Sequence, residues 1–140
     1  MVTAFTHSTA YPAVDSVKFG AAFNAARAQS AQIREATSAF EDRDDMTLYV
    51  LAPDAQSGYA IRPDGELVYV FSLVKGRGRF IVSSAIADGA VYLDCFEGYL
   101  PRLYGGHGFE RVATVPNWTP GGPDVVLMAL AGYADRHGVA

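Results

Sequence analysis

The spacing of apolar residues predicts helices in the first third of the chain and mostly strands after it. From Asp15 to about Phe40, apolar side chains recur at the three- and four-residue intervals of a helix. Asp15 or Ser16 can cap its start, and a break near residues 29–31 would divide it into two helices. The first twelve residues are expected to form an extended arm or an irregular first strand.

From Met46 onward, short apolar runs bounded by turn residues are typical of strands. Arg62-Pro63-Asp64-Gly65 predicts a tight turn, because proline presets one φ angle and glycine accepts a positive one. The expected strands cover residues 46–51, 58–62, 66–74, 90–96, 109–115 and 124–130, and short helices are expected at 80–87 and 98–107.

This order of elements predicts a mixed α/β sheet. The 140 residues suit one domain, with a helical part at 1–45 and a sheet core at 46–140. The net charge of −4 argues against a nucleic-acid binder. No apolar run approaches the roughly 20 residues of a membrane span. A single cysteine, Cys95, excludes an internal disulfide and suits a reducing compartment, and we expect a cytoplasmic protein with no metal.

The sequence Lys75-Gly76-Arg77-Gly78-Arg79 follows an apolar strand and precedes a helix. In that order of elements, backbone N–H groups of the loop and of the first helical turn point outward together and can bind a phosphate or pyrophosphate. Three cations in five residues of an acidic chain favour such an anion site. The alternative is a tight turn with a solvated basic rim.

Further along, a strand at 90–96 and a short helix lead to Tyr104, and Gly108-Phe109 follow at the spacing Tyr-x-x-x-Gly-Phe. Together with the glycine loop and the two last strands, this arrangement resembles the GNAT superfamily of N-acyltransferases, over about two thirds of the chain. The resemblance implies a mostly antiparallel sheet that splits at a V-shaped notch, with helices on both faces. It also implies acetyl-CoA, or another acyl-CoA, as the co-substrate.

The resemblance further implies roles for individual residues. Tyr104 would protonate the departing thiolate, and Asp94 would act as the base, with Glu97 and His107 as other candidates for the base. Tyr104 could instead be a helix residue packed on the sheet, with its hydroxyl bonded to a backbone carbonyl. The implied pantetheine contacts are the backbones of Phe71, Ser72, Leu73 and Val74, and the implied pyrophosphate contacts are Lys75, Gly76, Arg77, Gly78 and Arg79.

The chain departs from the family where the loop usually ends in a small residue, because Phe80 stands there. That departure favours an alternative, a catalytically silent GNAT-like domain that binds a protein partner. A third interpretation is a related enzyme with a donor other than CoA. The expected acceptor is an amine of a small molecule or a protein. The sequence does not fix the oligomeric state, and a homodimer is one option. Cys95 is expected to be a buried apolar residue, and Trp118 to line the acceptor pocket or to cap the core.

Overall fold

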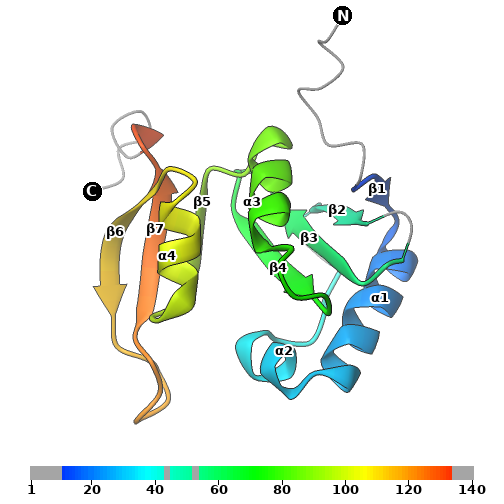
Figure 1. Cartoon of the computed structure of the whole chain (residues 1–140), viewed down its shortest axis with the longest axis horizontal. Coiled ribbons are helices and arrows are strands. Elements are labelled where there is room, and N and C mark those ends of the chain that lie inside the picture. Colours follow the sequence, from blue (N-terminus) through cyan, green and yellow to red (C-terminus); the bar gives the residue numbers. More distant parts are fainter. Residues whose placement is uncertain (1–10, 43–44, 52–53, 134–140) are drawn as a thin grey trace, which may run out of the picture. The chain divides into compact units, whose positions relative to one another are not determined.

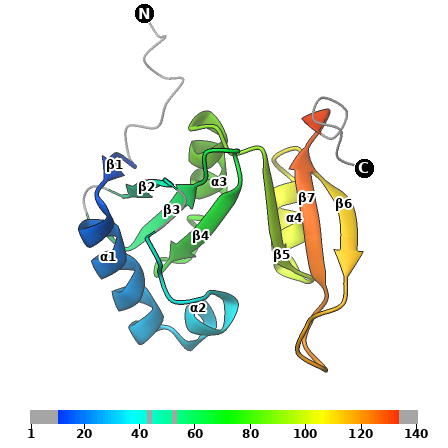
Figure 2. The same cartoon turned by 180° about the vertical axis from the view of Figure 1, so that it is seen from behind.

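The computed structural model describes residues 11–42, 45–51 and 54–133 (Figures 1 and 2). The chain forms two compact units, Met1–Ala90 and Val91–Ala140. The strands are β1 (Ala13–Val14), β2 (Thr47–Val50), β3 (Ser57–Ile61), β4 (Leu67–Ser72), β5 (Tyr92–Phe96), β6 (Phe109–Val115) and β7 (Val125–Leu130). The helices are α1 (Ser16–Gln29), α2 (Ala31–Ala36), α3 (Gly78–Ala87) and α4 (Tyr99–Gly105).

The helix break expected near residues 29–31 is confirmed, and it lies at Ser30. The backbone of Ser30 is extended, and its N–H still donates to Ala26 at 3.0 Å, which closes α1. Its hydroxyl accepts from the N–H of Ile33 at 3.2 Å and so caps α2. Asp15 caps α1 in the same way, by accepting from Lys18 at 2.8 Å. Of the expected N-terminal arm, residues 1–10 lie outside the described part of the chain.

The first unit contains a four-stranded antiparallel sheet in the order β1-β2-β3-β4. The expected turn between β3 and β4 is confirmed, because the N–H of Gly65 donates to Arg62 at 2.8 Å and Gly65 has φ +95°. The order places β3 inside the sheet and β4 at its end, so one backbone edge of β4 is not paired within this sheet.

Helices α1 and α3 cover opposite faces of this sheet. On the α1 face, Phe19 and Phe23 pack in one apolar cluster with Ala60 of β3 and Phe71 of β4. On the α3 face, the hydroxyl of Tyr59 donates to Asp88 at the end of α3 (2.6 Å) and lies 2.8 Å from the hydroxyl of Ser84. Every residue of β3 is buried as a result.

A β-bulge interrupts β4 at Tyr69. The pairing of β3 with β4 shifts register between Gly58 and Ala60, and Tyr69 has φ +53°, a left-handed conformation that is rare for an aromatic residue. Val68 and Tyr69 both pack on the α1-face cluster as a result, although successive residues of a regular strand face opposite sides. The Tyr69 hydroxyl also accepts from the backbone N–H of Glu41 at 3.2 Å.

The second unit contains a three-stranded antiparallel sheet in the order β5-β7-β6, with α4 on one of its faces (Figures 1 and 2). Cys95, Met128 and Phe109 lie on that face, because the pairing register of the three strands places their side chains on the same side of the sheet. The ring of Tyr104 in α4 lies edge-on to Phe109, with 5.8 Å between ring centroids. None of the helices within the described residues is long and apolar enough to cross a membrane.

The core under α1 gives a test of this packing. Phe23 is fully buried among aromatic rings, so Phe23→Ala leaves a cavity and should lower the free energy of unfolding by about 3–5 kcal/mol. Val17 on the same helix is 80% exposed, and Val17→Ala should change the free energy by less than about 0.5 kcal/mol. Urea titrations of both variants make the comparison, and equal losses would contradict the packing described.

Candidate functional site

The basic glycine loop connects the edge strand β4 with α3. β4 ends at Ser72 and α3 begins at Gly78, so the loop proper covers residues 73–77. Gly76 has φ +85°, and a Cβ built there would meet no atom within 4 Å, which means that the space beside this peptide is open. The strand, loop and helix expected from the sequence are therefore present in that order.

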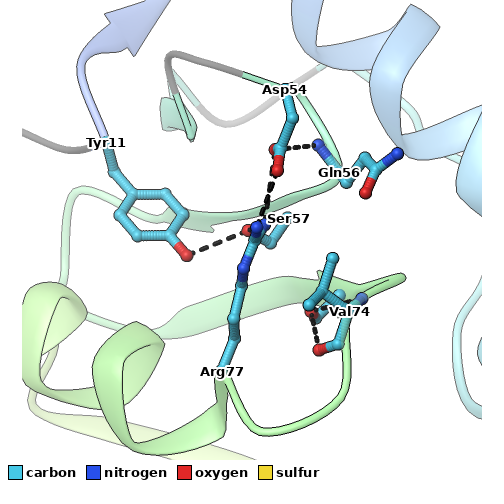
Figure 3. Close-up of polar contacts among 7 residues, drawn as sticks. Tyr11, Asp54, Gln56, Ser57, Val74 and Arg77 are labelled. Atoms are coloured by element: carbon cyan, nitrogen blue, oxygen red, sulfur yellow. Dashed lines mark hydrogen bonds and ion pairs between the residues drawn. The ribbon is translucent and has the colours of Figure 1, made fainter.

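The end of β4 is held by a local set of hydrogen bonds (Figure 3). The Ser72 hydroxyl donates to the carbonyl oxygen of Val74 (2.8 Å) and accepts from the N–H of Val74 (3.1 Å). The N–H of Leu73 donates to the carbonyl oxygen of Gln56, just before β3, at 2.8 Å. Since neighbouring residues of a strand direct their peptide groups to opposite sides, the N–H and C=O of Ser72 point away from β3, toward the outer edge of the sheet.

The start of α3 has no side-chain cap. Arg77 occupies the N-cap position, where its carbonyl accepts from the N–H of Ile81 at 2.9 Å, and no side chain among the described residues bonds the first turn. The N–H groups of Gly78, Arg79 and Phe80 belong to that turn and have no partner inside the helix. Such groups carry a partial positive charge and attract anions.

The three loop cations are not equivalent. Lys75 and Arg79 are exposed, and neither pairs with an acidic side chain in the described ranges. Arg77 is half-buried and forms an ion pair with Asp54 at 2.6 Å. The hydrogen bond from Arg77 lowers the pKa of Asp54 below its ordinary value. Two of the three cations therefore remain available to an anion.

Asp54, Ser57 and Tyr11 were not predicted as site residues from the sequence. Asp54 comes 23 residues before Arg77, and no periodicity links the two positions. The one available signal was the position of Asp54 in a turn before a strand, where its carboxylate accepts from the N–H of Gln56 at 2.9 Å.

Phe80, the bulky residue of the loop region, packs against an aromatic partner. Its ring centroid lies 5.5 Å from that of Tyr11, and 49% of the residue is exposed. Tyr11 in turn contacts the ring of Tyr59 at 5.4 Å. Phe80 thus has a packing partner at the position where the resemblance predicts a small residue.

Tyr104 lies in the last turn of α4, in the second unit. Its side chain is buried, with 4% exposed, and within the described residues its hydroxyl has no hydrogen-bond partner. The bond to a backbone carbonyl that the alternative interpretation required is therefore not formed among them. Burial raises the pKa of Tyr104, so the phenol is protonated at neutral pH but is a weaker acid than an exposed tyrosine.

The three candidate bases differ in their surroundings. Asp94 is exposed on β5, and its place next to Cys95 in the strand puts it on the sheet face opposite α4 and Tyr104. Glu97 binds both terminal nitrogens of Arg111 at 2.6 Å, and these bonds lower the pKa of Glu97, which makes it a weak base. His107 is half-buried just after α4, and its backbone N–H donates to the carbonyl of Tyr104 at 3.0 Å.

Cys95 and Trp118 fall outside any such chemistry. Cys95 is buried against Met128, as expected, and burial raises the pKa of its thiol to about 12. Trp118 is 79% exposed beside Phe96, so it does not cap the core. In the part of the chain that the structure describes, no group of three or more His, Cys, Asp or Glu side chains could hold a metal ion.

No protein-family model and no curated protein matches the chain. Its fold is similar to that of the aminoglycoside acetyltransferase AAC(6')-Ib, in a crystal structure with coenzyme A and kanamycin. The TM-score is 0.58 over 94% of this chain and 99% of that chain, at 15% sequence identity. At that identity the likeness shows the fold alone. It confirms the expected GNAT-like fold, a mixed α/β arrangement of antiparallel sheets and helices; the V-shaped notch stays a prediction.

The raised pKa of Cys95 predicts an unreactive thiol. In the native protein at pH 7.5, iodoacetamide should label Cys95 at least about a hundredfold more slowly than in 6 M guanidinium chloride, because only the thiolate reacts and burial suppresses it. Mass spectrometry of the alkylated protein measures both rates. Rapid native labelling would show that Cys95 is accessible and ionised.

Proposed function

We propose that this chain is an acyl-CoA-dependent N-acyltransferase that moves an acyl group to an amine. The observation that carries the proposal is the uncapped start of α3, which follows an edge strand and lies between two cations without an acidic partner among the described residues. The similar fold of an acetyltransferase crystallised with coenzyme A and an amine antibiotic supports it.

The proposed coenzyme contacts follow from the same geometry. The pyrophosphate would accept hydrogen bonds from the N–H groups at the start of α3, with Lys75 and Arg79 balancing its charge. Gly76 leaves room for a close approach of the backbone. Ser72 directs its peptide groups to the outer edge of β4, where the amides of the pantetheine arm could add as a strand adds to a sheet edge. Phe71, Leu73 and Val74 flank Ser72 on this edge, and the backbone hydrogen bonds of Leu73 and Val74 fix its shape.

When bound, the acyl-CoA supplies a thioester whose carbonyl carbon is open to attack by an amine. The new C–N bond forms as the C–S bond breaks, so the sulfur must gain a proton and the amine must lose one. The phenol of Tyr104 is proposed to donate the proton to the sulfur, and the resulting phenolate then takes a proton back through water. Because Asp94 lies on the other face of the sheet from Tyr104, we propose that the amine proton leaves through water rather than by direct transfer to Asp94.

One observation favours a second candidate function. A phenylalanine at position 80 suits a silent GNAT-like domain that has lost its coenzyme and binds a protein partner instead. A domain of that kind would keep the fold and the sheet, but it would have no need of the two unpaired cations. A related enzyme with another acyl donor would keep the cations and ignore CoA.

Acetyl-CoA should therefore raise the melting temperature of the protein. A ligand present at 100 times its dissociation constant adds about 2.7 kcal/mol of stability, which corresponds to a shift of about 8–12 °C for a chain of this size. Acetyl-pantetheine, which carries the thioester without the pyrophosphate, serves as the matched control and should give a much smaller shift. Differential scanning fluorimetry measures both.

No shift with acetyl-CoA, combined with no turnover of any primary amine, would favour the silent domain. An equal shift with acetyl-pantetheine would leave the pyrophosphate site without support. A response to another acyl donor alone would favour the third interpretation.

Tyr104→Phe should lower kcat on the order of tenfold or more and leave the dissociation constant of acetyl-CoA unchanged, because only the transferable proton is removed. The buried ring keeps its contact with Phe109, so the melting temperature should stay within about 2 °C of the parent value. Release of the CoA thiol, followed with a chromogenic disulfide, measures kcat. An unchanged kcat would remove Tyr104 from the mechanism.

A further inference from the structure

Four side chains of the first unit connect the glycine loop with the start of β3 and the segment before it (Figure 3). They are Tyr11, Asp54, Ser57 and Arg77, and we refer to them as the Arg77 anchor. None of them but Arg77 belongs to the loop, and the proposed coenzyme contacts do not require the other three.

The guanidinium of Arg77 is engaged from two sides. One terminal nitrogen donates to Asp54 (3.3 Å) and to the hydroxyl oxygen of Ser57 (3.1 Å), and the other donates to Asp54 at 2.6 Å. Ser57 is fully buried, and its hydroxyl lies 2.9 Å from that of Tyr11, which is also fully buried. Both terminal nitrogens are therefore bonded within the protein.

The segment 54–57, which accepts the hydrogen bonds of Arg77, is itself fixed in place. The Asp54 carboxylate accepts from the N–H of Gln56 at 2.9 Å, and the carbonyl of Gln56 accepts from Leu73 at 2.8 Å. The segment 54–57 thus meets the loop twice, once through the backbone of Leu73 and once through the side chain of Arg77. An isolated ion pair of this exposure contributes little, but a network with buried hydroxyls holds one geometry.

The position of Arg77 in the backbone gives this contact its importance. Arg77 stands between Gly76 and Gly78, two residues with wide conformational freedom, and it is the N-cap of a helix that has no side-chain cap. A loop of this composition loses much entropy when it orders around a ligand, unless another contact orders it beforehand. The side chain of Arg77 supplies that contact.

We propose that Arg77 is a positioning residue, held by Asp54 and Ser57 so that the amides at the start of α3 are aligned for a phosphate before the coenzyme binds. Lys75 and Arg79 are then the cations that touch the phosphates. The inference rests on the proposed function. Its rival assigns Asp54 the opposite role, a carboxylate that occupies Arg77 until a phosphate displaces it.

The two roles predict opposite signs for Asp54→Ala. Under the positioning role, Asp54→Ala and Arg77→Ala each weaken coenzyme A binding by about tenfold, and the double variant binds no more weakly than the singles, because both changes release the same anchor. Isothermal titration calorimetry with coenzyme A measures the affinities at 50, 150 and 300 mM salt. Glu66→Gln, which removes a carboxylate from the Arg62 ion pair at the β3–β4 turn, is the matched control and should bind like the parent.

The salt dependence separates positioning from direct contact. Lys75→Ala and Arg79→Ala should flatten the dependence of the affinity on salt, because each removes a charge from the phosphates, whereas Arg77→Ala should leave its slope unchanged. Amide hydrogen exchange in the ligand-free protein should speed up at residues 75–80 in both anchor variants. If Arg77→Ala does not fold, Arg77→Lys and Asp54→Asn replace the pair.

Tighter binding by Asp54→Ala would overturn the proposal in favour of the rival. A much larger loss in Arg77→Ala than in Asp54→Ala, with a flatter salt dependence, would make Arg77 a phosphate contact and would also overturn it. If the parent protein binds no coenzyme A, the proposed function fails, and exchange at residues 75–80 then decides the anchor alone. Faster exchange in both variants supports its role in ordering the loop, and unchanged exchange removes that role.

Discussion

Burial of β3 on both faces is the constraint on which the first unit depends. All five residues of this strand are buried, so each position must suit a neighbour on a particular side. Ala60 leaves room for the phenylalanines of α1, and Tyr59 reaches α3 with its hydroxyl. A Cβ at Gly58 would collide with the carbonyl oxygen of Tyr49 and would lie 3.0 Å from the ring of Phe71, so only glycine fits there. Pairing and packing together therefore fix this strand.

The glycine loop is held in place by its contacts with β3. Ser57, the first residue of β3, bonds both to Tyr11 and to Arg77, so the rigid centre of the sheet extends directly to the start of α3. At the other end of α3, Asp88 is bonded to Tyr59 of the same strand. The buried strand β3 thus holds α3 at both ends of the helix. The backbone N–H groups in the first turn of α3 are fixed in position as a result.

Local features of the chain were predictable from sequence, and long-range contacts were not. The cap at Asp15, the break at Ser30 and the turn ending in Gly65 depend on residues within four positions of one another, and all three were expected. The pairing of Asp54 with Arg77 spans 23 positions, and the contact of Tyr11 with Phe80 is longer still. Periodicity and motif spacing carry no information on such pairs, because the fold alone brings them together.

The left-handed residue in β4 has a consequence for loop engineering. The extra residue at Tyr69 reverses which side every later residue of the strand presents, up to Ser72. If a glycine loop were grafted together with an uninterrupted strand, the residues before the loop would be shifted by one position. Their side chains would then point to the opposite face of the sheet, and their peptide groups to the opposite edge. Transplants between chains of this fold must carry the irregular tyrosine along with the glycines, or the recipient strand must be lengthened by one position.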